Sequence, residues 1–450
     1  MNQSAVLVWW ILVSWSLVVA MGGPLVAQPP PPRPNIVLIM ADDFGYECVG
    51  ANGGQSWNTP CLDRLARRGI RFEHCYSQPL CTPSRVQLMT GIYNVRNYTR
   101  FGVLEPGQIT FANLLRDSGY RTCVTGKWQL KGDPGEFGFD EYCLWQLNRV
   151  PERYPNPGLE INGRQVDFRD GQYGPDVVSD YACQFIRDNR DRPFLLYYPM
   201  ILTHCPFCPT PDSDDWDPAS GGSATYKGDP AYFGDMVAYM DKLVGKIDRQ
   251  LRDAGVADNT LLLFTGDNGT DSPVVSRWNG RQVAAGKKMM SDAGTRVPLI
   301  ATWPGTIPSG QVSQDLVDFS DFLPTLCDVG AVGVPDRLAI DGRSFLDSLR
   351  GQPGNPREWV YCWFSRNGGA EGKQWARNRQ YKLYADGRMF DVPADPLEQS
   401  PLNGADLSAE ARSARATLQT VLERYREARP PEVAAVGQAG QATKKQGQRK

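Results

Sequence analysis

The sequence predicts an α/β protein with a large, mostly parallel central sheet sandwiched by helices, followed by a smaller C-terminal subdomain of antiparallel sheet plus helix. Unbroken apolar runs, such as NIVLIM at 35–40 and TLLLFT at 260–265, are typical of strands buried on both faces of a sheet. Between such runs lie amphipathic segments, as at 231–255, where apolar residues recur at alternating spacings of three and four. Towards the C-terminus the runs shorten, and they predict strands at 359–364, 381–384 and 388–391 and a helix at 408–429.

Composition also divides the chain into segments. Residues 5–20 are apolar and small residues follow them, which predicts a secretory signal peptide and export, with a retained membrane anchor as the alternative. The predicted divisions are a signal peptide at 1–27, a Pro-rich spacer at 28–34, a catalytic domain at 35–353, a C-terminal subdomain at 354–430 and a disordered basic tail at 431–450.

The overall composition is that of an ordinary globular protein. Of the 450 residues, 41% are hydrophobic and 22% are charged, and the formal net charge is −2. This balance gives no reason to expect nucleic acid or an anionic membrane as a partner. Export permits disulfides among the 11 cysteines, but their spacing does not dictate pairs. The oligomeric state is left open.

Two acidic residues follow the first predicted strand, and an Asp-Asn pair follows a later one. Asp42 and Asp43 come directly after NIVLIM, and Asp267 and Asn268 come directly after TLLLFT. If these strands are neighbours, their carboxyl ends bring four oxygen ligands to one edge of the sheet, where open α/β sheets place ligands. Carboxylate and amide oxygens suit Ca²⁺ or Mg²⁺ rather than a soft metal.

A short helix is predicted to begin at the stretch Cys81-Thr82-Pro83-Ser84-Arg85. Proline suits the first turn of a helix, and Gly91 can end it. Cys81 then faces unpaired N–H groups at the positive end of the helix dipole, which favours an anion. Arg85 adds a planar guanidinium suited to a tetrahedral oxyanion. Before this stretch, Thr59, Pro60 and Gly69 predict another helix at 59–69.

Further strand ends carry two candidate cations. A helix at 110–118 leads into a strand at 120–124, after which comes Lys127. A helix at 178–190 leads into the strand PFLLYYPM at 193–200, after which comes His204. The only other histidine, His74, lies before the Cys81 stretch and is the poorer candidate for chemistry. A strand at 299–303 and a helix at 318–327 complete the predicted catalytic domain.

In their order along the chain, the motifs ADDFG, TPCLDRLARRG, CTPSR, GKW, GDNG and GTRVP resemble those of a type I sulfatase of the alkaline phosphatase superfamily. The resemblance spans roughly residues 35–402. It implies that a maturation enzyme converts Cys81 to formylglycine, whose hydrated aldehyde is the nucleophile. It also implies a Ca²⁺ ion, with Mg²⁺ as the alternative, bound by Asp42, Asp43, Asp267, Asn268 and the modified Cys81.

The same resemblance assigns the remaining site residues. Arg85 and Lys127 would hold the formylglycine hydroxyls and neutralise charge. His204 and Lys287 would bind the sulfate oxygens, and one of them would protonate the leaving alcohol. Lys287 is assigned by its spacing to the GTRVP motif, which matches the family. The implied activity is that of a sulfuric ester hydrolase acting on sulfate monoesters.

One position departs from the family. The usual Gly-Lys-Trp-His-Leu reads Gly-Lys-Trp-Gln-Leu here, so Gln129 stands at the histidine position. Glutamine can hydrogen-bond a hydroxyl but cannot take its proton at neutral pH. We therefore expect Asp267 or water to carry that role, or turnover to be slow. A carbohydrate O-sulfate is favoured over an aryl sulfate as substrate. The alternatives are a phosphonate or phosphate ester hydrolase and an inactive relative that binds sulfated glycans.

Overall fold

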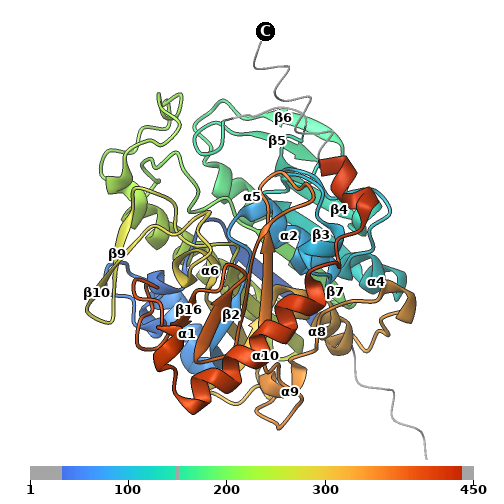
Figure 1. Cartoon of the computed structure of the whole chain (residues 1–450). Helices are drawn as coiled ribbons and strands as arrows, with labels where there is room; N and C mark the ends of the chain where they lie inside the picture. Colours follow the sequence, from blue (N-terminus) through green and yellow to red (C-terminus); the bar gives the residue numbers. More distant parts are fainter. Residues whose placement is uncertain (1–32, 148–151, 438–450) are drawn as a thin grey trace, which may run out of the picture. The chain divides into compact units, whose positions relative to one another are not determined.

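The computed structural model describes residues 33–147 and 152–437, so the predicted signal peptide, most of the spacer and the end of the tail lie outside the described residues. No helix in the described ranges combines the length and the apolar character needed to cross a membrane. A ten-stranded sheet forms the centre of this part of the chain (Figure 1). Its middle strand is β1 (Asn35–Ala41), which lies parallel to β7 (Phe194–Pro199) on one side and β8 (Thr260–Gly266) on the other.

The rest of the sheet is mixed. The order is β12-β2-β11-β8-β1-β7-β3-β4-β5-β6, with β11 antiparallel to both of its neighbours and β5 antiparallel to β4 and β6. The two edge strands are β12 (Gln311–Asp318) and β6 (Arg164–Asp167). The other strands not yet described are β2 (Ile70–Tyr76), β3 (Arg121–Gly126), β4 (Glu141–Trp145), β5 (Gly158–Ile161) and β11 (Leu299–Thr302).

Helices cover both faces of the sheet. Successive side chains of β1 point to opposite faces, and every residue of this strand is therefore buried. Ile36, Leu38 and Met40 pack in one apolar core, and Val37 and Ile39 pack in the other. The first core is covered by α2 (Cys81–Thr90), α4 (Phe111–Asp117), α8 (Phe322–Val329) and α10 (Ala409–Tyr425), and the second by α1 (Pro60–Arg68), α5 (Gly174–Asp188) and α6 (Phe233–Asp253). Three single-turn helices are α3 (Asn94–Asn97), α7 (Asp292–Thr295) and α9 (Leu346–Leu349).

A separate four-stranded antiparallel sheet lies in the C-terminal part, as expected. Its strands are β13 (Val360–Phe364), β14 (Lys373–Arg377), β15 (Tyr381–Tyr384) and β16 (Met389–Asp391), and α10 packs on β14 and β15. A two-stranded ribbon of β9 (Val275–Trp278) and β10 (Arg281–Ala284) stands apart from both sheets.

Three predictions of local structure need correction. Helix α5 begins at Gly174 rather than 178, because Pro175 occupies its first turn. Strand β14 was not predicted, since KQWAR carries three polar residues among five. Residues 431–437, predicted as part of a disordered tail, are helical.

Candidate functional site

The candidate site lies at the carboxyl end of the central sheet, where four neighbouring strands end. Asp42 follows β1, Asp267 follows β8, and Lys127 follows β3. Backbone hydrogen bonds continue past the strands: Asp42 N–H donates to Leu202 O at 2.9 Å and Asp267 N–H to Ala41 O at 2.9 Å. The Lys127 N–H donates to Pro199 O at 2.7 Å, so the loop ends are fixed relative to one another.

The four predicted oxygen ligands come together. The Asp43 N–H donates to Asp267 Oδ1 at 3.0 Å, and Asn268 Nδ2 donates to Asp43 Oδ1 at 2.8 Å. All four side chains are fully buried. Two of their oxygens, Asp42 Oδ1 and Asn268 Oδ1, have no hydrogen-bond partner among the described residues. Buried oxygens without a partner are costly, and a hard cation such as Ca²⁺ would satisfy them, so the residues present fit the predicted ion.

Three cations surround this cluster. Arg85 Nη2 contacts Asp267 Oδ2 at 2.9 Å, and Arg85 Nη1 donates to Lys127 O at 2.9 Å. Lys127 pairs with Asp42 Oδ2, and Lys287 Nζ lies 2.5 Å from Asp43 Oδ2. Each of these carboxylates therefore has a cation of its own. The guanidinium of Arg85, expected to face an oxyanion, also braces the carboxylate of Asp267.

Cys81 is the first residue of α2, as predicted for this stretch, and Leu80 is the N-cap. Gly91 ends the helix in the left-handed conformation at φ 68°, as its sequence position predicted. The side chain of Cys81 is buried, and burial raises the pKa of its thiol. The start of α2 lies at the carboxylate cluster, because Arg85, one helical turn after Cys81, contacts Asp267 Oδ2 at 2.9 Å.

The cluster holds more acidic charge than burial favours. Burial, followed by the negative charge of the neighbouring Asp42, raises the pKa of Asp267 to about 7 despite the positive charge of Arg85. Burial would also raise the pKa of Asp42, but the positive charge of Lys127 leads the influences that hold it below its ordinary value. A site with this strain between like charges is stabilised by a bound cation.

His204 lies against the same cluster, with Nε2 3.7 Å from Asp43 Oδ2. Its ligand atom and those of Asp42 and Asp43 all lie within 4.8 Å of one another. Burial, followed by the charge of Lys127, lowers the pKa of His204 to about 4. The imidazole is therefore neutral near pH 7 in this structure.

The residue that contacts the other side of this imidazole could not be predicted from the sequence. Arg153 Nη1 lies 2.9 Å from His204 Nδ1 and donates to Cys205 O at 2.7 Å. Arg153 lies in the Gly- and Pro-rich region at 132–180, where no pattern distinguishes it from other charged residues. Asp271 was also missed, and it lies 3.8 Å from Lys287 Nζ.

The structure also describes His74, the cysteines and Gln129. His74 is in β2, and its Nδ1 lies 3.2 Å from the hydroxyl of Tyr76. All eleven cysteines lie within the described residues and none forms a disulfide, including Cys205 and Cys208 of the C-x-x-C stretch. Gln129 has a left-handed backbone (φ 52°), and its buried Oε1 has no partner in the described part of the chain.

A buried nucleophile position, several oxygen ligands and several cations form a cluster suited to a tetrahedral, negatively charged ester group. The family model of the sulfatases matches residues 34–332. The chain belongs to the sulfatase family. A second model, the C-terminal region of N-sulphoglucosamine sulphohydrolase, matches residues 282–428. The chain is thus a type I sulfatase of the alkaline phosphatase superfamily and a sulfuric ester hydrolase, as the motifs predicted.

The sequences of known sulfatases match most of this chain. It is 32% identical to arylsulfatase A of Bos taurus over 426 residues, covering 85% of this chain and 80% of that protein. It is 32% identical to N-acetylgalactosamine-6-sulfatase of Canis lupus familiaris over 360 residues, covering 71% and 67%. A structure solved with its substrate D-glucosamine-2-N,6-O-disulfate has a TM-score of 0.74 at 24% identity, covering 88% of this chain and 98% of that chain, and shows the shared fold.

Proposed function

We propose that this sulfatase hydrolyses sulfate monoesters of carbohydrates with a formylglycine made from Cys81 and a Ca²⁺ ion bound beside it. The observation that carries the proposal is the convergence of Asp42, Asp43, Asp267 and Asn268 with three cations next to Cys81. The carboxylates and the amide would hold the ion through hard oxygens. When bound, the ion supplies positive charge that stabilises negative charge on the nucleophile and on the sulfate.

The chain's own residues would then act on the ester. Lys127 and Arg85 hold the hydroxyls at position 81, and Asp267 or water takes the proton of the hydroxyl that bonds to sulfur as the bond from sulfur to the alcohol oxygen breaks. His204 and Lys287 bind the sulfate oxygens, and one of the two protonates the leaving alcohol; the neutral imidazole of His204 in this structure favours Lys287 for that step. The second hydroxyl at position 81 then returns a proton to the residue that protonated the alcohol, and the C–O bond to the sulfate breaks, which regenerates the aldehyde. The sulfate leaves with the proton taken in the first step, and water adds to the aldehyde again. The net reaction consumes one ester and one water and releases one alcohol and one hydrogen sulfate.

The carbohydrate preference is supported by the relatives. A protein named N-acetylgalactosamine-6-sulfatase matches over two thirds of its length, and arylsulfatase A matches over four fifths. We propose that a sugar sulfate is the substrate of this chain too, and that an aryl sulfate serves as the model substrate in assays. Export through the N-terminal segment and modification by a maturation enzyme belong to the same proposal.

Mass spectrometry of the intact peptide across Cys81, combined with rates on 4-nitrophenyl sulfate and 4-nitrophenyl phosphate, tests it. We expect the aldehyde at position 81, faster turnover of the sulfate, and loss of that turnover in Cys81→Ala. Faster turnover of the phosphate would favour a phosphate or phosphonate ester hydrolase. Glycan binding without hydrolysis, in protein whose Cys81 is converted, would favour an inactive binding protein and would refute the proposal.

A further inference from the structure

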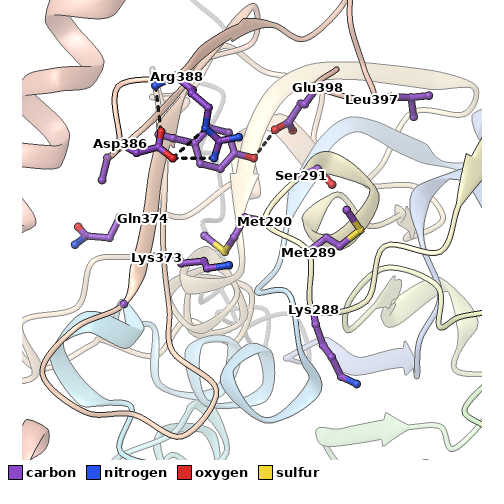
Figure 2. Close-up of a pocket in the computed structure, with 13 residues that line it drawn as sticks. Lys288, Met289, Met290, Ser291, Lys373, Gln374, Asp386, Arg388, Leu397 and Glu398 are labelled. Carbon is purple, nitrogen blue, oxygen red and sulfur yellow. Dashed lines mark hydrogen bonds and ion pairs between the residues drawn. The ribbon is translucent and has the colours of Figure 1, made fainter. Parts of the chain in front are cut away.

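A pocket of about 770 Å³ lies between the small C-terminal sheet and the loop that follows Lys287. One wall is the loop from Lys288 to Ser291, and the opposite wall comes from β14 and the turn that joins β15 to β16 (Figure 2). None of the residues predicted for catalysis or metal binding lines it. The pocket is therefore a space additional to the sulfate site.

The pocket nevertheless adjoins the sulfate site through the backbone. Lys288 lines the pocket and directly follows Lys287, so their Cα atoms are about 3.8 Å apart. The Lys288 N–H donates to Pro79 O at 2.7 Å, two residues before Cys81. Lys287 Nζ contacts Asp43 Oδ2, so one of two consecutive lysines lies at the sulfate site and the other lines the pocket.

The small sheet is held against the same region. Cys362 Sγ, in β13, lies 3.1 Å from Gln78 Oε1 in the segment that leads to Cys81. The rings of Tyr76 and Trp375 meet edge to face at 6.2 Å. The small sheet is therefore packed against the segment that leads to Cys81.

The charges in the pocket leave two lysines unneutralised. Asp386 pairs with Arg388 at 2.8 Å, and Glu398 pairs with Lys382, which is outside the lining, at 2.8 Å. Both acids are thus satisfied (Figure 2). In the part of the chain that the structure describes, Lys288 and Lys373 make no ion pair and no side-chain hydrogen bond.

These two lysines lie at different places. Figure 2 shows the Lys373 side chain beside Met290 within the pocket, and Lys288 at the edge with its ammonium directed away from Lys373. Both residues are exposed, and long flexible lysine side chains can turn towards a ligand. The one large aromatic ring in the lining, Tyr384, is covered by the guanidinium of Arg388 at 4.8 Å, so the pocket favours charge over ring stacking.

We propose that this pocket is a subsite for a second acidic group, a sulfate or a carboxylate, on the sugar next to the one whose ester is cleaved. Lys373 contacts that group within the pocket, and Lys288 contacts it or the linkage at the edge. The inference rests on the proposed carbohydrate sulfatase function. It narrows the substrate class to glycans with acidic groups on adjacent sugars.

The test uses two disaccharides with the same backbone, one with a single sulfate at the cleaved position and one with a further sulfate on the neighbouring sugar. In the wild type we expect a higher kcat/KM for the disulfated compound. In Lys373→Gln that preference should fall about fivefold, which corresponds to the roughly 1 kcal/mol of a solvent-accessible ion pair. Lys288→Gln should lower it by a smaller factor, and added salt should weaken it in the wild type.

Lys242→Gln is the matched control, because Lys242 pairs with Asp212 on a different surface and does not line the pocket. The preference should be the same in this variant as in the wild type. No preference in the wild type, or a preference equal in wild type and Lys373→Gln, overturns the subsite. If the wild type cleaves no sulfate ester at all, the proposed function fails instead, and calorimetric affinities for the same two disaccharides still decide the subsite by the same ratio.

Discussion

Replacing Arg377 by methionine tests whether the C-terminal sheet is locked to the loop that carries Lys287. Arg377 is 1% exposed, and its Nη1 lies 2.8 and 2.7 Å from the two carboxylate oxygens of Asp292. Asp292 begins α7, just beyond Met290, and Arg377 ends β14. The guanidinium also lies over the ring of Tyr76 at 4.5 Å. One side chain thus joins the small sheet to the strand that leads to Cys81.

The magnitude follows from what the change leaves behind. Removing one partner of a buried ion pair typically costs about 3–5 kcal/mol, because the other charge remains buried. Lys382 Nζ lies 3.4 Å from Asp292 Oδ1 and retains part of the compensation. We therefore expect Arg377→Met to lower the free energy of unfolding by about 3 kcal/mol.

Urea unfolding followed by tryptophan fluorescence measures the change as a lower midpoint. Arg377→Lys is the matched control, since it keeps the charge but loses the hydrogen bonds of Nε to Asn378 O and of Nη2 to Arg379 O, and it should cost less. The double variant Asp292→Asn with Arg377→Met should be more stable than the sum of the two single changes implies. A loss below about 1 kcal/mol in Arg377→Met, or simple additivity in the double variant, would refute the reasoning.

Four further outcomes are expected. Ca²⁺ at 100 times its dissociation constant should stabilise the protein by about 2.7 kcal/mol over protein in EDTA, measured as a higher Tm, and Asn268→Ala should reduce that gain. Gln129→His should raise kcat towards the ~100-fold that a positioned base typically contributes, and no gain would argue against an impaired base. Arg153→Met should lower kcat/KM on the order of tenfold by releasing His204, with partial rescue in Arg153→Lys. Burial, followed by nearby arginine charges, lowers the pKa of His74 from 6.5 to about 3, so the unfolded chain binds more protons than the folded protein between these pH values. The free energy of unfolding should therefore fall as the pH drops below 6.5, by at most about 1.4 kcal/mol per pH unit. Urea titrations at several pH values should show a flatter slope in His74→Gln.

The sequence was most informative where a residue sits directly at the end of a buried strand. NIVLIM predicted β1, and the adjacent pairs at 42–43 and 267–268 were predicted to meet because carboxyl ends of parallel strands share an edge. It could not predict that Arg153 contacts His204, since this contact joins a patternless loop to a residue 51 positions away. The pocket between Lys288 and Lys373 was equally out of reach, because β14 carries too few apolar residues to be recognised as a strand.

The pairing of β1 with β8 places Ala41 opposite Gly266, one residue before Asp42-Asp43 and Asp267-Asn268 respectively. Deleting a single residue within either strand would rotate every later side chain of that strand to the other face of the sheet and draw one of these ligand pairs back from the other. Insertions in the surface loops would leave this alignment untouched. The enzyme can therefore acquire new loops and new substrates over time, whereas the lengths of these two strands are fixed by the ion they are proposed to share.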